Sequence, residues 1–65
     1  MKILLNGEAF ATDAKTLDDL CARLELAEAK IATAVNGSFV AAPARSVTEL
    51  APSDEIEIVA PRQGG

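Results

Sequence analysis

The first five residues predict a β-strand that places Met1, Ile3 and Leu5 on one face. Asn6-Gly7 follows directly. This dipeptide favours a two-residue hairpin turn, because both central residues of a type I′ turn need positive φ. Residues 8–12 are therefore expected to return as a second strand. Such a hairpin is marginally stable alone and needs other elements to cover it.

One amphipathic helix is predicted after this hairpin. Thr16 is a candidate N-cap, and Asp19, three residues later, weakly matches the capping box in which a side chain reaches back to the cap. The apolar positions that follow have the spacing of a single helical stripe. They are Leu17, Leu20, Cys21 and Leu24.

Three more strands are predicted in the second half of the chain. Two of them, at 31–36 and 38–40, flank a second Asn-Gly pair. The third covers 55–60, where the alternation of side chains turns Ile56 and Ile58 to the same inward face. The order of elements therefore reads strand, strand, helix, strand, strand, strand.

A short helical segment is expected before the last strand. Ser46 could cap a single turn over residues 47–50, and Glu49 stands at the capping-box position. Pro43, a few residues earlier, ends the preceding strand pattern. The last strand is in turn ended by Pro61.

These elements indicate an α+β fold, with a sheet of about five strands covered on one face by one main helix. Residues 1–60 are expected to form one domain, and residues 61–65 a flexible C-terminal tail. The core should consist of apolar residues that the strands and the helix turn inward. They are Ile3, Leu5, Leu17, Leu20, Leu24, Leu26, Ile31, Val35, Leu50, Ile56 and Ile58.

Composition excludes several kinds of chemistry. The 65 residues include no His and a single Cys, so the chain offers no Cys/His zinc site, no intrachain disulfide and no His-activated nucleophile. Cys21 lies on the apolar helix stripe, where a thiol usually packs as a small hydrophobe. A reactive thiol is the alternative interpretation.

Charge and hydropathy also limit the partners. The net charge is −4 and the six basic residues are scattered, so no nucleic-acid footprint is expected. No apolar run is long enough to span a membrane, and the setting is expected to be cytoplasmic. Glu55 and Glu57 lie on the outward side of the last strand. They are interpreted as solvated surface or, alternatively, as a patch that docks a basic partner.

The two final residues, Gly64 and Gly65, serve no predicted turn. They have two ordinary explanations, a flexible tail or a cloning remnant. The functional alternative is that the terminal carboxylate is the reacting group, carried on an arm without side chains that can enter a narrow channel. A carboxylate is a poor electrophile until it is adenylated. This chain has no nucleotide-binding motif, so another protein must activate it.

The chain as a whole resembles the sulfur-carrier proteins of thiamine biosynthesis, which belong to the ubiquitin-like β-grasp superfamily. Four markers carry the resemblance. They are Met1-Lys2-Ile3 with Asn6-Gly7-Glu8, Ala34-Val35-Asn36-Gly37 with Phe39-Val40, the run from Asp54 to Val59, and the Gly64-Gly65 end. The segment 41–44 departs from the pattern, because many relatives carry Pro and Arg directly after the strand.

The resemblance implies a β-grasp fold with a mixed sheet and a protein cosubstrate that is not itself an enzyme. The Gly65 carboxylate would be adenylated by a ubiquitin-activating-like adenylyltransferase, which uses ATP and Mg²⁺, while this chain itself binds no cofactor or metal. Arg62, Gln63 and Gly64 would thread the tail into that enzyme. A cysteine desulfurase or another persulfide donor would supply sulfur, and thiazole synthase would receive it from the resulting thiocarboxylate.

The docking surface is expected on the outer face of the sheet. Leu4 and Val59 point away from the predicted core, and we expect them to contact the partner enzymes together with Glu57 and Arg62. Two other functions stay open. One is the small sulfur-carrying subunit of molybdopterin synthase, which also ends in Gly-Gly but is typically longer. The other is a non-covalent ubiquitin-like interaction module, which would tolerate the loss of Gly65.

Overall fold

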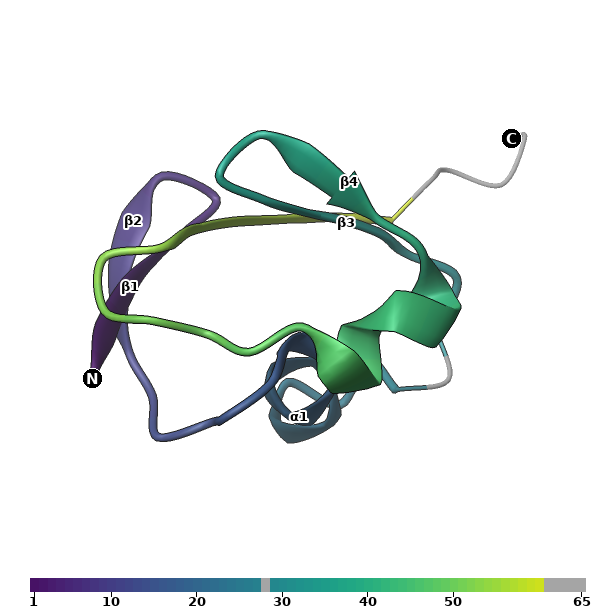
Figure 1. Ribbon diagram of the computed structural model, residues 1–65, viewed down its shortest axis with the longest axis horizontal. Coiled ribbons are helices and arrows are strands. Elements are labelled where there is room, and N and C mark those ends of the chain that lie inside the picture. The colour runs from purple at the N-terminus through teal and green to yellow at the C-terminus, as the bar shows by residue number, and fades with distance from the viewer. Residues whose placement is uncertain (28, 61–65) are drawn as a thin grey trace.

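The computed structural model describes residues 1–27 and 29–60, and it confirms the predicted order of elements (Figure 1). A hairpin, a helix, a second hairpin, a 3₁₀ helix and a final strand follow one another along the chain. They are β1 (Lys2–Leu5), β2 (Glu8–Ala11), α1 (Leu17–Arg23), β3 (Ala32–Val35), β4 (Ser38–Val40), η1 (Ala42–Val47) and β5 (Glu55–Val59).

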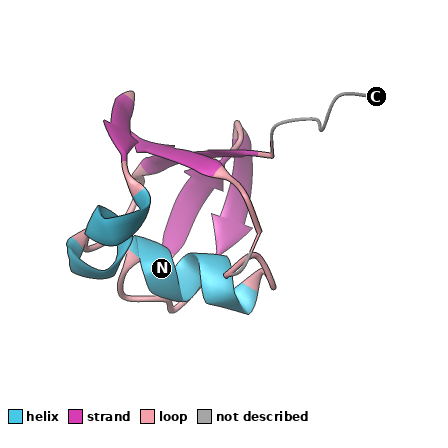
Figure 2. Cartoon of the chain, turned by 90° about the vertical axis from the view of Figure 1, so that its right-hand side faces the viewer, coloured by secondary structure: helices cyan, strands magenta, loops and turns pink. Residues whose placement is uncertain are grey.

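The five strands form one mixed sheet in the order β2-β1-β5-β3-β4. The last strand of the chain therefore lies in the middle, parallel to β1 and antiparallel to β3. Both helical elements lie on the same side of this sheet (Figure 2). The α+β architecture predicted from the sequence is thus confirmed, and the sheet keeps one face without a helix.

Both Asn-Gly pairs make the predicted hairpin turns. Asn6 and Gly7 have φ of 51° and 86°, and Asn36 and Gly37 have φ of 51° and 85°. All four values lie in the left-handed region, which glycine adopts freely and asparagine tolerates better than most residues. Because each turn contains only two residues, the register of both hairpins is fixed.

Thr16 is the N-cap of helix α1, as predicted. The hydroxyl of Thr16 accepts a hydrogen bond from the amide of Asp19 at 3.1 Å, which satisfies one of the free donors of the first turn. The Asp19 carboxylate accepts from the amide of Lys15 at 3.3 Å, one residue before the cap, so the capping box closes outside its usual position. The Arg23 guanidinium and this amide bond lower the pKa of Asp19.

The prediction of a helical turn over residues 47–50 was wrong. The 3₁₀ helix η1 begins five residues earlier and has no side-chain cap from Ser46. Pro43 lies near its start, where the fixed φ of proline suits a helix and its missing N–H costs nothing. Glu49 forms an isolated β-bridge with Thr16 instead of a capping box.

The core lies between α1 and the covered face of the sheet. Its buried apolar residues include Ile3, Leu17, Leu20, Ile56 and Ile58, all of them predicted. The other six predicted core residues are partly buried and pack against this cluster. Three further apolar residues belong to this cluster or pack against it, although they were not predicted as core residues. They are Ala14, Phe10 and Val40.

A buried polar contact joins η1 to β3. Thr33 is only 1% exposed, and its hydroxyl donates to the carbonyl of Val40 at 2.7 Å. The same oxygen accepts from Arg45 Nε at 3.0 Å, and Arg45 Nη2 donates to the carbonyl of Ile31 at 2.8 Å. The Arg45 side chain therefore ties η1 to the sheet through neutral acceptors.

Replacing Thr33 by Val should destabilise the fold by about 1–3 kcal/mol, the usual effect of leaving buried polar partners without a hydrogen bond. Valine has nearly the same shape as threonine but offers nothing to Arg45 Nε or to the Val40 carbonyl. Urea denaturation measures the loss. T33S keeps the hydroxyl and is the matched control. A T33V protein as stable as the wild type would show that this contact contributes nothing.

Candidate functional site

The face of the sheet that the helices leave open is the candidate site (Figure 2). Along β5 the side chains alternate strictly. Ile56 and Ile58 are buried against the helix, whereas Glu55, Glu57 and Val59 are exposed on the opposite side. We call this exposed side, with the outward residues of the other four strands, the outer face.

The three described residues of the predicted docking surface all lie on the outer face. Val59 is 58% exposed and pairs with Ala32 of β3, and Glu57 pairs with Ala34. Leu4 is 36% exposed on the neighbouring strand β1. Because the side chains of Ala32 and Ala34 are small, the surface is depressed beside Val59 and Glu57.

Phe39 belongs to the same surface and was missed. It is 71% exposed on β4 and pairs with Ala34, so it stands across β3 from Glu57. A shallow hollow of about 230 Å³ lies between them. Its lining is Ala32, Thr33, Ala34, Phe39, Glu57 and Val59. The fixed register of the second Asn-Gly hairpin was the signal that could have placed Phe39 here.

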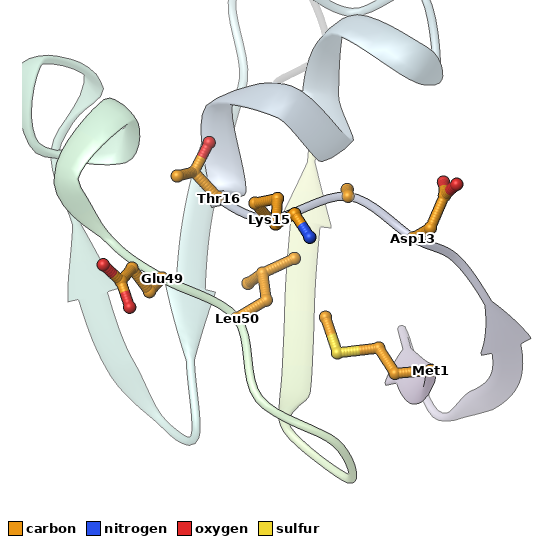
Figure 3. A pocket seen from close by; sticks show the side chains of 7 residues that line it. Met1, Asp13, Lys15, Thr16, Glu49 and Leu50 are labelled. Carbon is orange, nitrogen blue, oxygen red and sulfur yellow. The ribbon is translucent and has the colours of Figure 1, made fainter.

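A larger hollow, of about 500 Å³, lies away from the predicted site. It is formed where the first strand meets the segments around residues 13–16 and 49–50 (Figure 3). The carboxylates of Asp13 and Glu49 stand at opposite sides of it, and they do not converge on a common point. In residues 1–27 and 29–60, no group of acidic residues or cysteine is arranged to hold a metal ion.

The remaining predicted site residues are Arg62, Gln63, Gly64 and Gly65, and they lie outside the described residues. Ala60, directly after β5, is the last of the described residues. The flexibility expected for residues 61–65 likewise stays a prediction. The element that carries this tail is the central strand of the sheet, with Glu57 and Val59 of the outer face near its end.

Comparison with known proteins identifies the family. A sequence model of the ThiS family matches residues 3–65. The chain belongs to the ThiS family. This match confirms the resemblance inferred from the sequence markers, and it extends through the Gly64-Gly65 end. No curated protein matches the chain in a sequence search.

Among solved structures, the ThiS-family chain is similar to a thiamine biosynthesis protein (ThiS) from Geobacter metallireducens. The TM-score is 0.84 at 23% identity, and the match covers 100% of each chain. The likeness confirms the predicted β-grasp fold. Within the described part of this ThiS-family chain, no helix is both long and apolar enough to cross a membrane.

The only thiol of this ThiS-family chain is buried. Cys21 is in the core cluster beside Leu17 and Leu20, as core packing predicts. Burial raises the pKa of the thiol, while the charge of Arg45 lowers it less and Asp18 raises it slightly. A neutral, enclosed thiol is a poor nucleophile, because the thiolate is the reactive form. The core interpretation of Cys21 is therefore favoured over the reactive one.

Cys21 should consequently resist alkylation in the folded protein and react fast once the chain is unfolded. Its raised pKa also gives a pH dependence. Above about pH 8.5, the ordinary thiol pKa, the unfolded chain loses this proton more readily than the folded one, so stability should fall as pH rises. The measurement is iodoacetamide labelling with and without urea. Rapid labelling of the native protein would contradict the buried state, and C21A is the blank.

Proposed function

We propose that this chain is a sulfur carrier of thiamine biosynthesis and that its reacting group is the carboxylate of Gly65. The observation that carries the proposal is the family match over residues 3–65, which includes the Gly-Gly end. ThiS-family membership supports the sulfur-carrier role in general. The steps at the carboxylate, the partners and the contact residues are the parts that the proposal adds.

The proposed chemistry begins with activation. A carboxylate is resonance-stabilised and resists attack, whereas an acyl adenylate offers AMP as a leaving group. A partner adenylyltransferase, using ATP and Mg²⁺, joins the Gly65 carboxylate to AMP and releases pyrophosphate. The persulfide of a cysteine desulfurase, or of another donor, then attacks the acyl carbon and displaces AMP, which gives an acyl disulfide between the carrier and the donor. A thiol attacks the donor's sulfur of this disulfide, forms a new disulfide with the donor and releases the thiocarboxylate, from which thiazole synthase takes the sulfur.

The described residues fit a cosubstrate better than a catalyst. The chain contains no His, and Cys21, its one thiol, is enclosed in the core. The acid pair on the outer face, Glu55 and Glu57, is exposed and has no basic partner among the salt bridges of the described residues. Catalytic groups, ATP and Mg²⁺ are therefore assigned to the partner enzyme.

The outer face is proposed as the surface that docks the adenylyltransferase and thiazole synthase. It exposes the apolar residues Leu4, Phe39 and Val59 beside the carboxylates of Glu55 and Glu57, and an apolar patch bordered by charged groups is common at protein interfaces. Glu57 adds a negative charge at the border of this patch, which suits a basic partner. Arg62 and the residues up to Gly64 would lead the carboxylate into the active site. We place the exchange in the cytoplasm, where thiols stay reduced.

Intact mass spectrometry tests the proposal. The protein is incubated with ATP, Mg²⁺, the adenylyltransferase from the same organism and a persulfide donor. The expected product has one oxygen replaced by sulfur, and it should fail to form when ATP is left out. Delivery of the sulfur to thiazole synthase, and not to a molybdopterin synthase, then distinguishes the two carrier functions. A chain that binds its partners and keeps its mass would be a non-covalent module.

A further inference from the structure

The strands on either side of β5, which are β1 and β3, pair with it over different lengths. The parallel pairing of β1 with β5 ends at Leu5 and Ile56, where the amide of Asn6 donates to the carbonyl of Ile56 at 2.8 Å. Asn6 then begins the turn into β2. Strand β5 continues to Val59, and its pairing with β3 extends that far, through the pair of Val59 with Ala32. After Ile56, the edge of β5 that faces β1 therefore has no strand paired with it.

The side chain of Asn6 occupies this edge. Its Oδ1 accepts from the amide of Ile58 at 2.9 Å, and its Nδ2 donates to the carbonyl of Ile58 at 3.1 Å. One side-chain amide thus satisfies both backbone groups of Ile58, which in a longer parallel β1 would bond to two different residues. The φ of 51° at Asn6 lets the backbone turn away while the side chain stays beside β5.

We infer that Asn6 is a positioning residue for the tail. Its side chain anchors the end of β5 along the edge where the pairing with β1 has stopped. The anchored end of β5 is the fixed part of the chain to which the tail is attached. The inference rests on the proposed function, in which the Gly65 carboxylate must reach a reaction centre. Loosening Ile58 lengthens the flexible segment that carries this carboxylate and lowers the effective concentration of the carboxylate at the reaction centre. Looser anchoring of Ile58 should therefore slow the reaction.

The chain contains a matched control at its other Asn-Gly turn. Asn36 has the same φ of 51°, and its side chain also makes two hydrogen bonds. Its Oδ1 accepts from the amide of Glu55 at 2.9 Å, and its Nδ2 donates to Asp54 Oδ1 at 3.0 Å. These bonds hold the beginning of β5, roughly 10 Å further from the tail than Ile58 at the rise of a strand. Asn36 therefore stabilises the same strand without holding its end.

The test compares N6G with N36G. Glycine keeps the positive φ of each turn and removes both side-chain bonds. Hydrogen exchange comes first, on the folded proteins. N6G should speed the exchange of the Ile58 amide by about tenfold and leave the Glu55 amide unchanged, because the opening is local. N36G should give the reverse. Equal exchange of Ile58 in N6G and the wild type would overturn the inference.

Adenylation kinetics follow, with carrier concentration varied at saturating ATP. N6G should lower kcat about tenfold and keep KM near the wild-type value, because the outer face that docks the enzyme is unchanged. N36G should keep both constants within about twofold. A purely structural role predicts the same kcat for the two variants when both are folded, and that result would overturn the positioning role. An N6G effect confined to KM would also overturn it.

The outcomes separate this inference from the proposed function. A wild-type chain that the partner does not adenylate would overturn the proposed function and the tail-positioning role with it. A wild-type chain that is adenylated, together with N6G of unchanged kcat, would overturn the role of Asn6 alone. N6D adds a graded point. It keeps an acceptor for the Ile58 amide but places a carboxylate oxygen beside the Ile58 carbonyl, so its kcat should lie below that of the wild type.

Discussion

Deleting Gly65 should abolish thiocarboxylate formation while the protein melts at the same temperature. The deletion moves the terminal carboxylate back by about 3.3–3.6 Å, the length of one extended residue. Since a displacement of ~1 Å already costs on the order of 100-fold in a positioned reaction, the residual rate should be below about 1% of the wild type.

One residue added after Gly65 should be equally damaging. It moves the carboxylate forward and puts an amide where the reacting group belongs. Neither change should affect stability by more than about 0.5 kcal/mol, as for most surface changes, because the buried residues of the described chain lie between Ile3 and Ile58.

Intact masses of the three chains, after incubation with the adenylyltransferase, ATP, Mg²⁺ and a persulfide donor, check this prediction. Only the wild type should gain an adenylate or a thiocarboxylate, and thermal unfolding should be the same for all three. Equal thiocarboxylate formation on every chain would contradict the carrier mechanism. Partner binding that survives in all three, with no modification of any, would favour the non-covalent module.

The elements that sequence could predict are those specified by nearby residues. Alternation placed Ile56 and Ile58 in the core, and the two Asn-Gly pairs fixed both hairpins, because a two-residue turn leaves no freedom of register. The helix start followed from Thr16, whose hydroxyl bonds an amide only three residues away. Each of these signals is complete within a short window of sequence.

The 3₁₀ helix shows where a local signal misleads. Ser46 and Glu49 have the spacing of a capping box, yet the helix has already formed by Ser46 and ends at Val47. Pro43 was interpreted as the end of a strand, although the same fixed φ also suits the start of a helix. The amide of Leu50 instead donates a hydrogen bond to the carbonyl of Lys15 at 2.9 Å. That contact joins distant segments and is invisible in the local pattern.

The hydrogen bonds that support the candidate site could not be predicted from the sequence either, because their partners lie far apart along the chain. Asn6 looks like a turn residue, and its second role depends on Ile58, which lies far along the chain. Thr33 is tolerated in the core because Arg45 and the Val40 carbonyl satisfy its hydroxyl. Hydrogen-bond partners brought together by the fold cannot be predicted from residue type. The tail residues, in contrast, could be proposed from sequence because their chemistry needs no packing.

Charging the outer face should weaken partner binding without unfolding the protein. We expect V59D to raise the Kd for the adenylyltransferase at least about tenfold, because a carboxylate would have to be desolvated in an apolar contact beside Glu57. L4D should act in the same direction from β1. Phe39, the more exposed of the two large apolar residues that line the hollow, should give the largest effect on replacement by Ala, since buried aromatic anchors often dominate interfaces.

Val47 provides the matched control for V59D. It is 77% exposed, more than Val59, but it lies in η1 on the side of the sheet that carries the helices. V47D therefore introduces the same charge at an exposed valine outside the proposed interface. Isothermal titration calorimetry without ATP measures binding apart from the reaction at the tail. V47D should bind within about twofold of the wild type. If V47D weakened binding as much as V59D, the interface would not be confined to the outer face, and net charge would explain both effects.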